Sequence, residues 1–147
     1  MKPLEIIALS LGAYGAHRYL QGTPLSPKEL AQRWIDTLAR RNPEEITKLY
    51  AMDGILIPTF GKIKCGRAAI TEYFERFMEF HGLQGKYNSM IVQEYISNRV
   101  NGCIVSGTYT FQFVSEEGPQ TVDARYSFVF NSEGLILNHH SSGLPDM

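Results

Sequence analysis

The sequence has little cysteine, no marked excess of positive or negative charge, and no long apolar run. Its two cysteines, Cys65 and Cys103, lack C-x-x-C spacing and do not identify a redox compartment. Fourteen Lys and Arg residues face fifteen Asp and Glu residues, which leaves a formal net charge of −1. No stripe of basic residues interleaved with aromatics is present, so a role in binding nucleic acid has little support.

Common catalytic motifs are also missing. The sequence has no G-x-S-x-G, no glycine-rich phosphate loop and no H-E-x-x-H. Zinc requires three or four converging ligands, and two of the four histidines, His17 and His81, lie far in sequence from the other pair. We therefore expect no metal and no cofactor.

The uncharged stretch from Ile6 to Ala16 is too short to span a bilayer. It follows Lys2, whose charge Glu5 cancels, and it ends in small residues. One interpretation is that residues 1–16 act as a signal peptide and the protein is exported. The other is that residues 1–24 form an N-terminal extension, an extra helix on the domain or on a neighbour. We expect a cytoplasmic protein without a membrane span, with export as the alternative.

The rest of the chain, residues 25–147, predicts a single globular domain. Hydrophobic residues make up 44% of the sequence, which is typical of such a domain. Ser26-Pro27-Lys28-Glu29 has the N-cap, first-turn proline and capping-box glutamate of a helix, and Asn42-Pro43-Glu44-Glu45 repeats the signal. The second helix is expected to carry Ile46, Leu49 and Tyr50.

A strand, a third helix and a run of strands follow. Residues 54–58 predict a strand, and Gly66-Arg67 opens a helix that ends at Gly82. Beyond Lys86 the sequence alternates between apolar and polar residues. The turn signals lie at Asn98, Asn101-Gly102, residues 117–119 and residues 131–134. Helices followed by long strands predict an α+β fold with an antiparallel meander.

The most unusual segment is the last predicted strand, residues 135–142, which changes from aliphatic to polar along its length. Alternation divides it into two faces: Leu135, Leu137, His139 and Ser141 on one, and Ile136, Asn138, His140 and Ser142 on the other. The two histidines are either hydrogen-bonded structural residues or include one that transfers protons near neutral pH. We choose His140 for the second role, because Asn138 and Ser142 share its face.

Several segments together resemble a known family. Residues 122–130, and residues 138–145 after a glycine turn, resemble the association (hub) domain of calcium/calmodulin-dependent protein kinase II. They are more similar still to its stand-alone bacterial and algal relatives, the iota class of carbonic anhydrases. Leu56-Ile57-Pro58-Thr59 and Ile70-Thr71-Glu72-Tyr73-Phe74 are also similar to that class. The most specific part is the His-His-Ser-Ser end, although many members have a further histidine where this chain has Asn138.

The resemblance implies a nuclear transport factor 2-like (cystatin-like) cone, with a curved antiparallel sheet wrapped on the N-terminal helices. It also implies a lyase that hydrates carbon dioxide to bicarbonate without a metal. The implied catalytic residues are Thr59, Tyr73, His140 and Ser142, with Arg125 and Ser141 binding substrate. In this hypothesis Thr59 and Tyr73 position water and bicarbonate. Ser142 donates a hydrogen bond, and His140 orients these groups or relays the proton.

Other interpretations stay open. Arg125, which shares a strand face with Asp123, is equally suited to an exposed cross-strand ion pair. A hub-like module without activity would form a homodimer or a larger homo-oligomer through the outer sheet face, and Tyr109, Phe111 and Phe113 would supply that contact. The same cone is also suited to binding a small apolar ligand.

Overall fold

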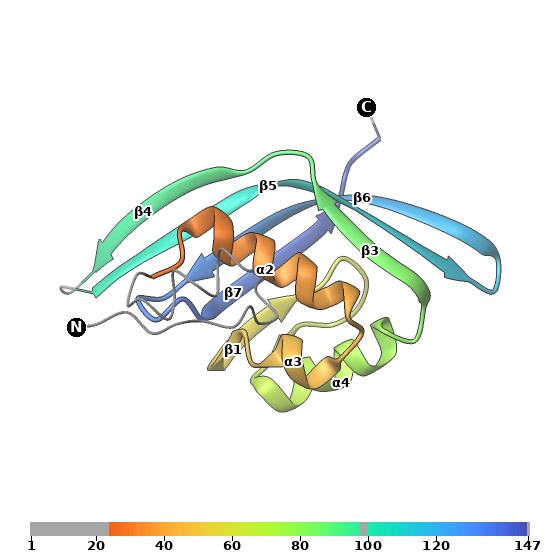
Figure 1. Cartoon of the computed structure of the whole chain (residues 1–147), viewed down its shortest axis with the longest axis horizontal. Coiled ribbons are helices and arrows are strands. Elements are labelled where there is room, and N and C mark those ends of the chain that lie inside the picture. Colours follow the sequence, from red (N-terminus) through yellow and green to blue (C-terminus); the bar gives the residue numbers. More distant parts are fainter. Residues whose placement is uncertain (1–23, 98–99, 147) are drawn as a thin grey trace, which may run out of the picture.

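The computed structural model describes residues 24–97 and 100–146. Its helices pack on one face of a strongly curved sheet (Figure 1). The helices are α2 (Pro27–Ala39), α3 (Pro43–Thr47) and α4 (Arg67–Phe77). The strands are β1 (Tyr50–Ile57), β2 (Lys64–Cys65), β3 (His81–Tyr87), β4 (Ile91–Ser97), β5 (Val100–Ser115), β6 (Gly118–Phe130) and β7 (Ile136–Gly143). The predicted α+β cone with a curved antiparallel sheet is confirmed.

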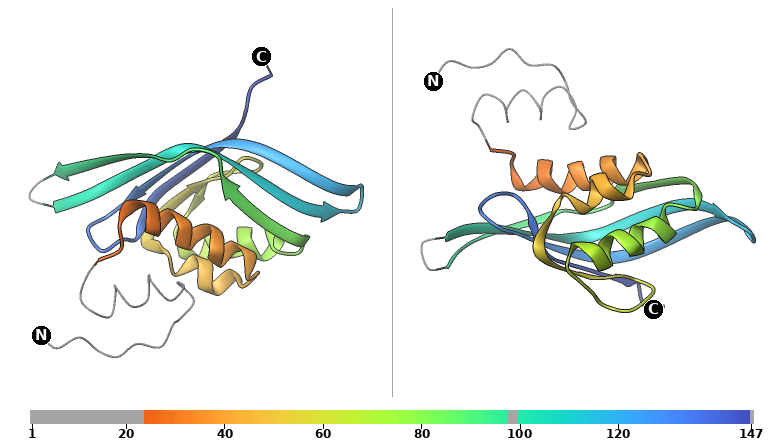
Figure 2. Two further views of the ribbon diagram at one scale, coloured as in Figure 1. Left: turned by 45° about the horizontal axis from the view of Figure 1, so that its top comes forward. Right: turned by 90° about the horizontal axis from the view of Figure 1, so that it is seen from below.

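The sheet has the order β2-β1-β7-β6-β5-β3, and β4 pairs with the remaining length of β5. The two views of Figure 2 show α2, α3 and α4 together on the concave side. Every pairing is antiparallel except that of β1 with β7, which is parallel. The first and last strands are therefore neighbours, and residues far apart in sequence meet there.

The helix starts lie where the sequence predicts them. Ser26 accepts a hydrogen bond from the backbone of Glu29, whose side chain bonds back to Ser26, so the capping box is complete. Asn42 caps α3 in a similar way. The second helix is shorter than predicted, because Tyr50 opens β1 instead of ending the helix.

Two turn assignments were wrong. Asn101-Gly102 lies inside β5, because Gly102 pairs with Tyr95 of β4 and the tyrosine ring fills the space that a Cβ would need. Gly82, predicted to end the third helix, lies in β3 with a φ of 63°, and α4 ends at Phe77. Both glycines allow a close approach or a left-handed backbone within a strand.

A bulge in β7 decides which way its polar end points. Val129 pairs with Asn138, but Phe130 pairs with Ile136, so Leu137 is an extra residue. Strict alternation therefore fails before Asn138 and holds after it. Ile136 and His139 both face the core, contrary to the predicted division of faces, since both are almost fully buried.

No helix among the described residues is long and apolar enough to cross a membrane. The predicted extension or signal segment at residues 1–24 lies, apart from Pro24, outside the described residues.

Candidate functional site

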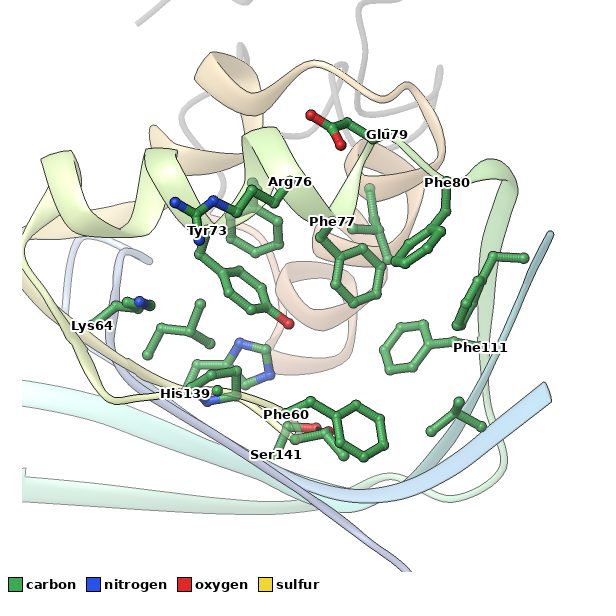
Figure 3. Close-up of a pocket in the computed structure, with 18 of the residues that line it drawn as sticks. Phe60, Lys64, Tyr73, Arg76, Phe77, Glu79, Phe80, Phe111, His139 and Ser141 are labelled. Atoms are coloured by element: carbon green, nitrogen blue, oxygen red, sulfur yellow. Dashed lines mark hydrogen bonds between the residues drawn. The ribbon is translucent and has the colours of Figure 1, made fainter. Parts of the chain in front are cut away.

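A cavity of about 550 Å³ opens between α4, the loop after β1 and the concave face of the sheet (Figure 3). Its polar and apolar side chains lie at different places. Tyr73, His139 and Ser141 lie at one side, and Phe77, Phe80 and Phe111 at the other. The cavity thus has a hydrogen-bonding end and an aromatic end.

The hydrogen-bonding end contains paired hydroxyl groups. The Oγ1 atom of Thr59, directly after β1, lies 2.5 Å from the Oγ atom of Ser141 on β7. This contact follows from the parallel pairing of β1 with β7, which places Ile57 beside His140. Tyr73 of α4 also lines the cavity, and its hydroxyl forms no hydrogen bond within the part of the chain that the structure describes.

His139 lies beneath these hydroxyls and is held on both ring nitrogens. Its Nδ1 atom is 2.8 Å from the hydroxyl of Tyr50, and its Nε2 atom is 3.2 Å from the hydroxyl of Tyr109. The imidazole stacks on Phe128 at a centroid distance of 4.2 Å and meets the edge of Trp34 at 4.9 Å. This histidine is a fixed, buried ring.

Donor counting assigns the tautomer of this ring. The indole nitrogen of Trp34 donates to the Tyr50 oxygen over 3.0 Å, so the Tyr50 hydrogen needs another acceptor. The acceptor present is Nδ1 of His139, which leaves the proton on Nε2 to be donated to Tyr109. Tyr109 then accepts from His139, and its own hydroxyl hydrogen is not bonded to the imidazole.

Burial keeps this group of side chains neutral. It lowers the pKa of His139 from 6.5 to about 3, with a smaller contribution from the nearby His140. Burial also raises the pKa of Tyr73 and of Tyr109, and a hydrogen bond with Ser141 opposes the shift at Tyr109. At neutral pH the hydrogen-bonding end consists of uncharged donors and acceptors.

The predicted site residues divide between the two faces of the sheet. Thr59, Tyr73 and Ser141, which the sequence prediction named as two catalytic residues and one substrate-binding residue, all line the cavity. His140 and Ser142 do not, so the prediction that they line the pocket is wrong. Both follow the β7 bulge on the outward face, where His140 is exposed.

Arg125 is also on the outer face, and its suggested position on the pocket side is wrong. It lies between Thr108 and Ser142 in the register of the sheet, and it is exposed. Tyr109 and Phe111 were suggested for an outer contact between subunits, but both are buried and line the cavity. Their alternation with polar residues correctly placed them on one face of the strand. It did not show whether that face meets the helices or the solvent.

Sequence reasoning missed the polar core of the site. His139, Tyr50, Tyr109 and Trp34 form one hydrogen-bonded group from four elements, and no local motif links them. One signal was available in the sequence: the alternation correctly placed His139 and Ser141 on the same face of the last strand.

No group of three His, Cys, Asp or Glu side chains able to hold a metal ion occurs among residues 24–97 and 100–146. The charged side chains near the cavity are Lys64, Glu72, Arg76 and Glu79. Arg76 pairs with Glu72 over 3.2 Å.

The concave sheet, the three covering helices and the cavity between them define a domain of the nuclear transport factor 2-like class. The model of the calcium/calmodulin dependent protein kinase II association domain matches residues 28–145. The chain belongs to this association domain family. None of the curated proteins matches the sequence.

Solved structures agree with this assignment. A Xanthomonas campestris protein assigned to the same association domain is 34% identical, with a TM-score of 0.72 over 82% of this chain and 86% of that one. A Mycobacterium tuberculosis protein of unknown function is 14% identical, with a TM-score of 0.64 over 82% of this chain and 70% of that one. An epoxide hydrolase/cyclase-like enzyme of polyether biosynthesis is 14% identical, with a TM-score of 0.62 over 80% and 89%. The last two likenesses concern the fold alone.

Proposed function

We propose that this protein is a carbonic anhydrase of the iota class, which hydrates carbon dioxide to bicarbonate with hydroxyl groups and without a metal. The observation that carries the proposal is the cluster of Thr59, Tyr73 and Ser141 at one end of a largely apolar cavity. An apolar cavity admits a neutral gas, and fixed hydroxyls are suited to holding the water that attacks it. The motif resemblance to the iota class points the same way.

In the proposed reaction, Thr59 and Ser141 hold the attacking water, whose oxygen bonds to the carbon of carbon dioxide. One C=O electron pair moves to the substrate oxygen, and the Tyr73 hydroxyl donates to that oxygen as its negative charge develops. The proton of the water leaves to buffer through the mouth of the cavity. Because burial lowers the pKa of His139 to about 3, this residue stays a neutral imidazole at neutral pH and does not take up the proton of the water. Its role is to position Tyr109 and, through it, Ser141.

In this proposal His139 takes the orienting role that the sequence prediction gave to His140, and Ser141 holds the water, whereas the hydrogen bond predicted from Ser142 comes from Tyr73. Bicarbonate is an anion, and the neutral hydroxyls offer no positive charge to bind it, which favours its release. A zinc site lowers the pKa of its bound water to about 7, and these hydroxyls supply no such charge, so turnover should be slow for this reaction.

The test is stopped-flow hydration of carbon dioxide by chelator-treated protein, with Thr59→Val and Tyr73→Phe alongside. Removing the Tyr73 donor is expected to lower the rate by about 100-fold, the lower end of the range for donors to a developing charge. Circular dichroism and thermal melting check that each variant folds. A folded parent protein with no activity above buffer would exclude the proposal.

We also propose that the protein is a homodimer or a larger homo-oligomer. The family is named for association, and half-buried aliphatic residues lie on the outer face of the sheet. The pairing register puts Ile55, Ile57, Ile104 and Val129 on the same face as His140. Sedimentation velocity of the parent, of Val129→Arg and of the loop control Ile63→Arg tests this. Only Val129→Arg is expected to dissociate the assembly. A monomeric parent protein would contradict the proposed homo-oligomer.

A further inference from the structure

We propose that the cavity binds a neutral, flat ring compound carrying one hydroxyl or carbonyl oxygen, with its ring against the phenylalanine wall and its oxygen at Tyr73. This inference does not rest on carbonic anhydrase activity. It concerns mainly the aromatic end of the cavity, and it shares only Tyr73 with the site proposed for carbon dioxide hydration.

The first argument is size and lining. A cavity of about 550 Å³ is far larger than carbon dioxide or bicarbonate needs, and it falls in the range of pockets that bind drug-sized ligands. The aromatic end is lined by Phe60, Phe77, Phe80, Phe111, Phe113 and Val122.

The arrangement of these rings suits a flat partner. Phe80 and Phe113 lie 4.6 Å apart with their planes at 33°, and Phe77 meets Phe111 at 75°. Such stacked and edge-on contacts are the ones that aromatic rings prefer. Phe60 is 71% exposed and Phe80 is 37% exposed, so this wall leaves apolar surface in contact with water that a ring compound would cover.

The second argument is charge. The two cations beside the cavity, Lys64 and Arg76, are balanced by Glu72 and Glu79, and Arg76 already pairs with Glu72. At the other end His139 is buried between two tyrosine hydroxyls. The cavity therefore has no net charge to offset the desolvation of an anion, and a neutral ligand is favoured.

The third argument is the Tyr73 hydroxyl. Among the polar groups of this end, Thr59 and Ser141 bond to each other and Tyr109 bonds to His139, but Tyr73 makes no hydrogen bond within the described residues. Figure 3 shows this hydroxyl pointing into the cavity, toward the side where His139 and Ser141 lie. A single oxygen on the ligand would satisfy it.

Equilibrium dialysis of the full chain at pH 7 against 2-naphthol, naphthalene and 2-naphthoate tests the proposal. We expect 2-naphthol to bind, naphthalene to bind more weakly, and the 2-naphthoate anion to bind weakest. Since carbon dioxide is not involved, a failure here is separate from a failure of the hydration assay. Absence of 2-naphthol binding, or tighter binding of 2-naphthoate, would overturn the proposal.

Two substitutions locate the ligand. Tyr73→Phe is expected to weaken 2-naphthol by about three- to tenfold, the value of one hydrogen bond, and to leave naphthalene unchanged. Val122→Phe fills the aromatic end and should weaken both neutral probes by about tenfold or more, a fold-change of the size expected for overpacking. Its matched control is Val114→Phe, at a valine that is 45% exposed and does not line the cavity. Equal binding by the Val122 and Val114 variants, with both folded, places the probe elsewhere and overturns the proposal.

Discussion

The two faces of β7 carry nearly the same residues in very different surroundings. His139 and Ser141 face inward, where both are buried, and His140 and Ser142 face outward. The inner pair is bonded to Tyr50, Tyr109 and Thr59, all from other elements. A histidine and a serine therefore do not define a site by themselves; the neighbours that the fold supplies define it.

The largest difference is expected in stability. His139→Ala removes a buried ring that stacks on Phe128 and bonds two tyrosines, which should lower the free energy of unfolding by about 3 kcal/mol. His140→Ala removes an exposed ring and should change it by less than about 0.5 kcal/mol. Urea unfolding of both variants measures the contrast. Equal losses would mean that the two faces do not differ as described.

The second difference is a dependence on pH. Since the pKa of His139 is about 3 in the folded protein and 6.5 unfolded, the unfolded state binds one more proton between these values. The contribution of this residue is complete above pH 6.5 and is lost as the pH falls, at about 1.4 kcal/mol per pH unit at most. From pH 6.5 to 4.5 the protein should lose about 2–3 kcal/mol from this source.

The control for this dependence is His139→Phe, which keeps a buried ring and removes the titration. Urea midpoints at pH 6.5, 5.5 and 4.5 should fall less steeply for His139→Phe than for the parent, whereas His140→Gln keeps the steep dependence. A parent and a His139→Phe variant with the same slope would show that His139 is not held neutral.

The third difference is in catalysis, and it distinguishes the sequence-based site from the structural one. Ser141→Ala removes the partner of Thr59 and should lower the rate of carbon dioxide hydration by about tenfold or more. Ser142→Ala, one residue further on and outside the cavity, should leave the rate within about twofold, as for a change that touches no reacting group. The opposite result would restore the site predicted from the sequence.

The sequence alone supports much of the fold but only part of the site. Local signals located the helix starts at Ser26 and Asn42, because these caps are formed by residues two or three positions apart. Thr59 and Tyr73 came from a motif resemblance. The choice of His140 over His139 failed because alternation shows which residues share a face, but not which face meets the helices.

Two features of the core were also beyond local reasoning. The bulge at Leu137 depends on the pairing of β6 with β7. The contact of Tyr50 with His139 depends on the parallel pairing of β1 with β7, 89 positions apart in sequence. Neither strand pairing can be recognised from the local sequence around it.

The smallest expected effect concerns the tautomer of the inner histidine. Donor counting puts the proton of His139 on Nε2, because Tyr50 accepts from Trp34 and donates to Nδ1. Nitrogen NMR of the labelled protein should show one tautomer for His139, whereas the exposed ring of His140 is free to exchange between two. Tyr50→Phe leaves the Trp34 N–H without its acceptor and Nδ1 without its donor, and should cost about 1–2 kcal/mol. If Nδ1 proves to carry the proton, Tyr109 must donate to His139 instead of accepting from it, and the donor assignment of this group would be overturned.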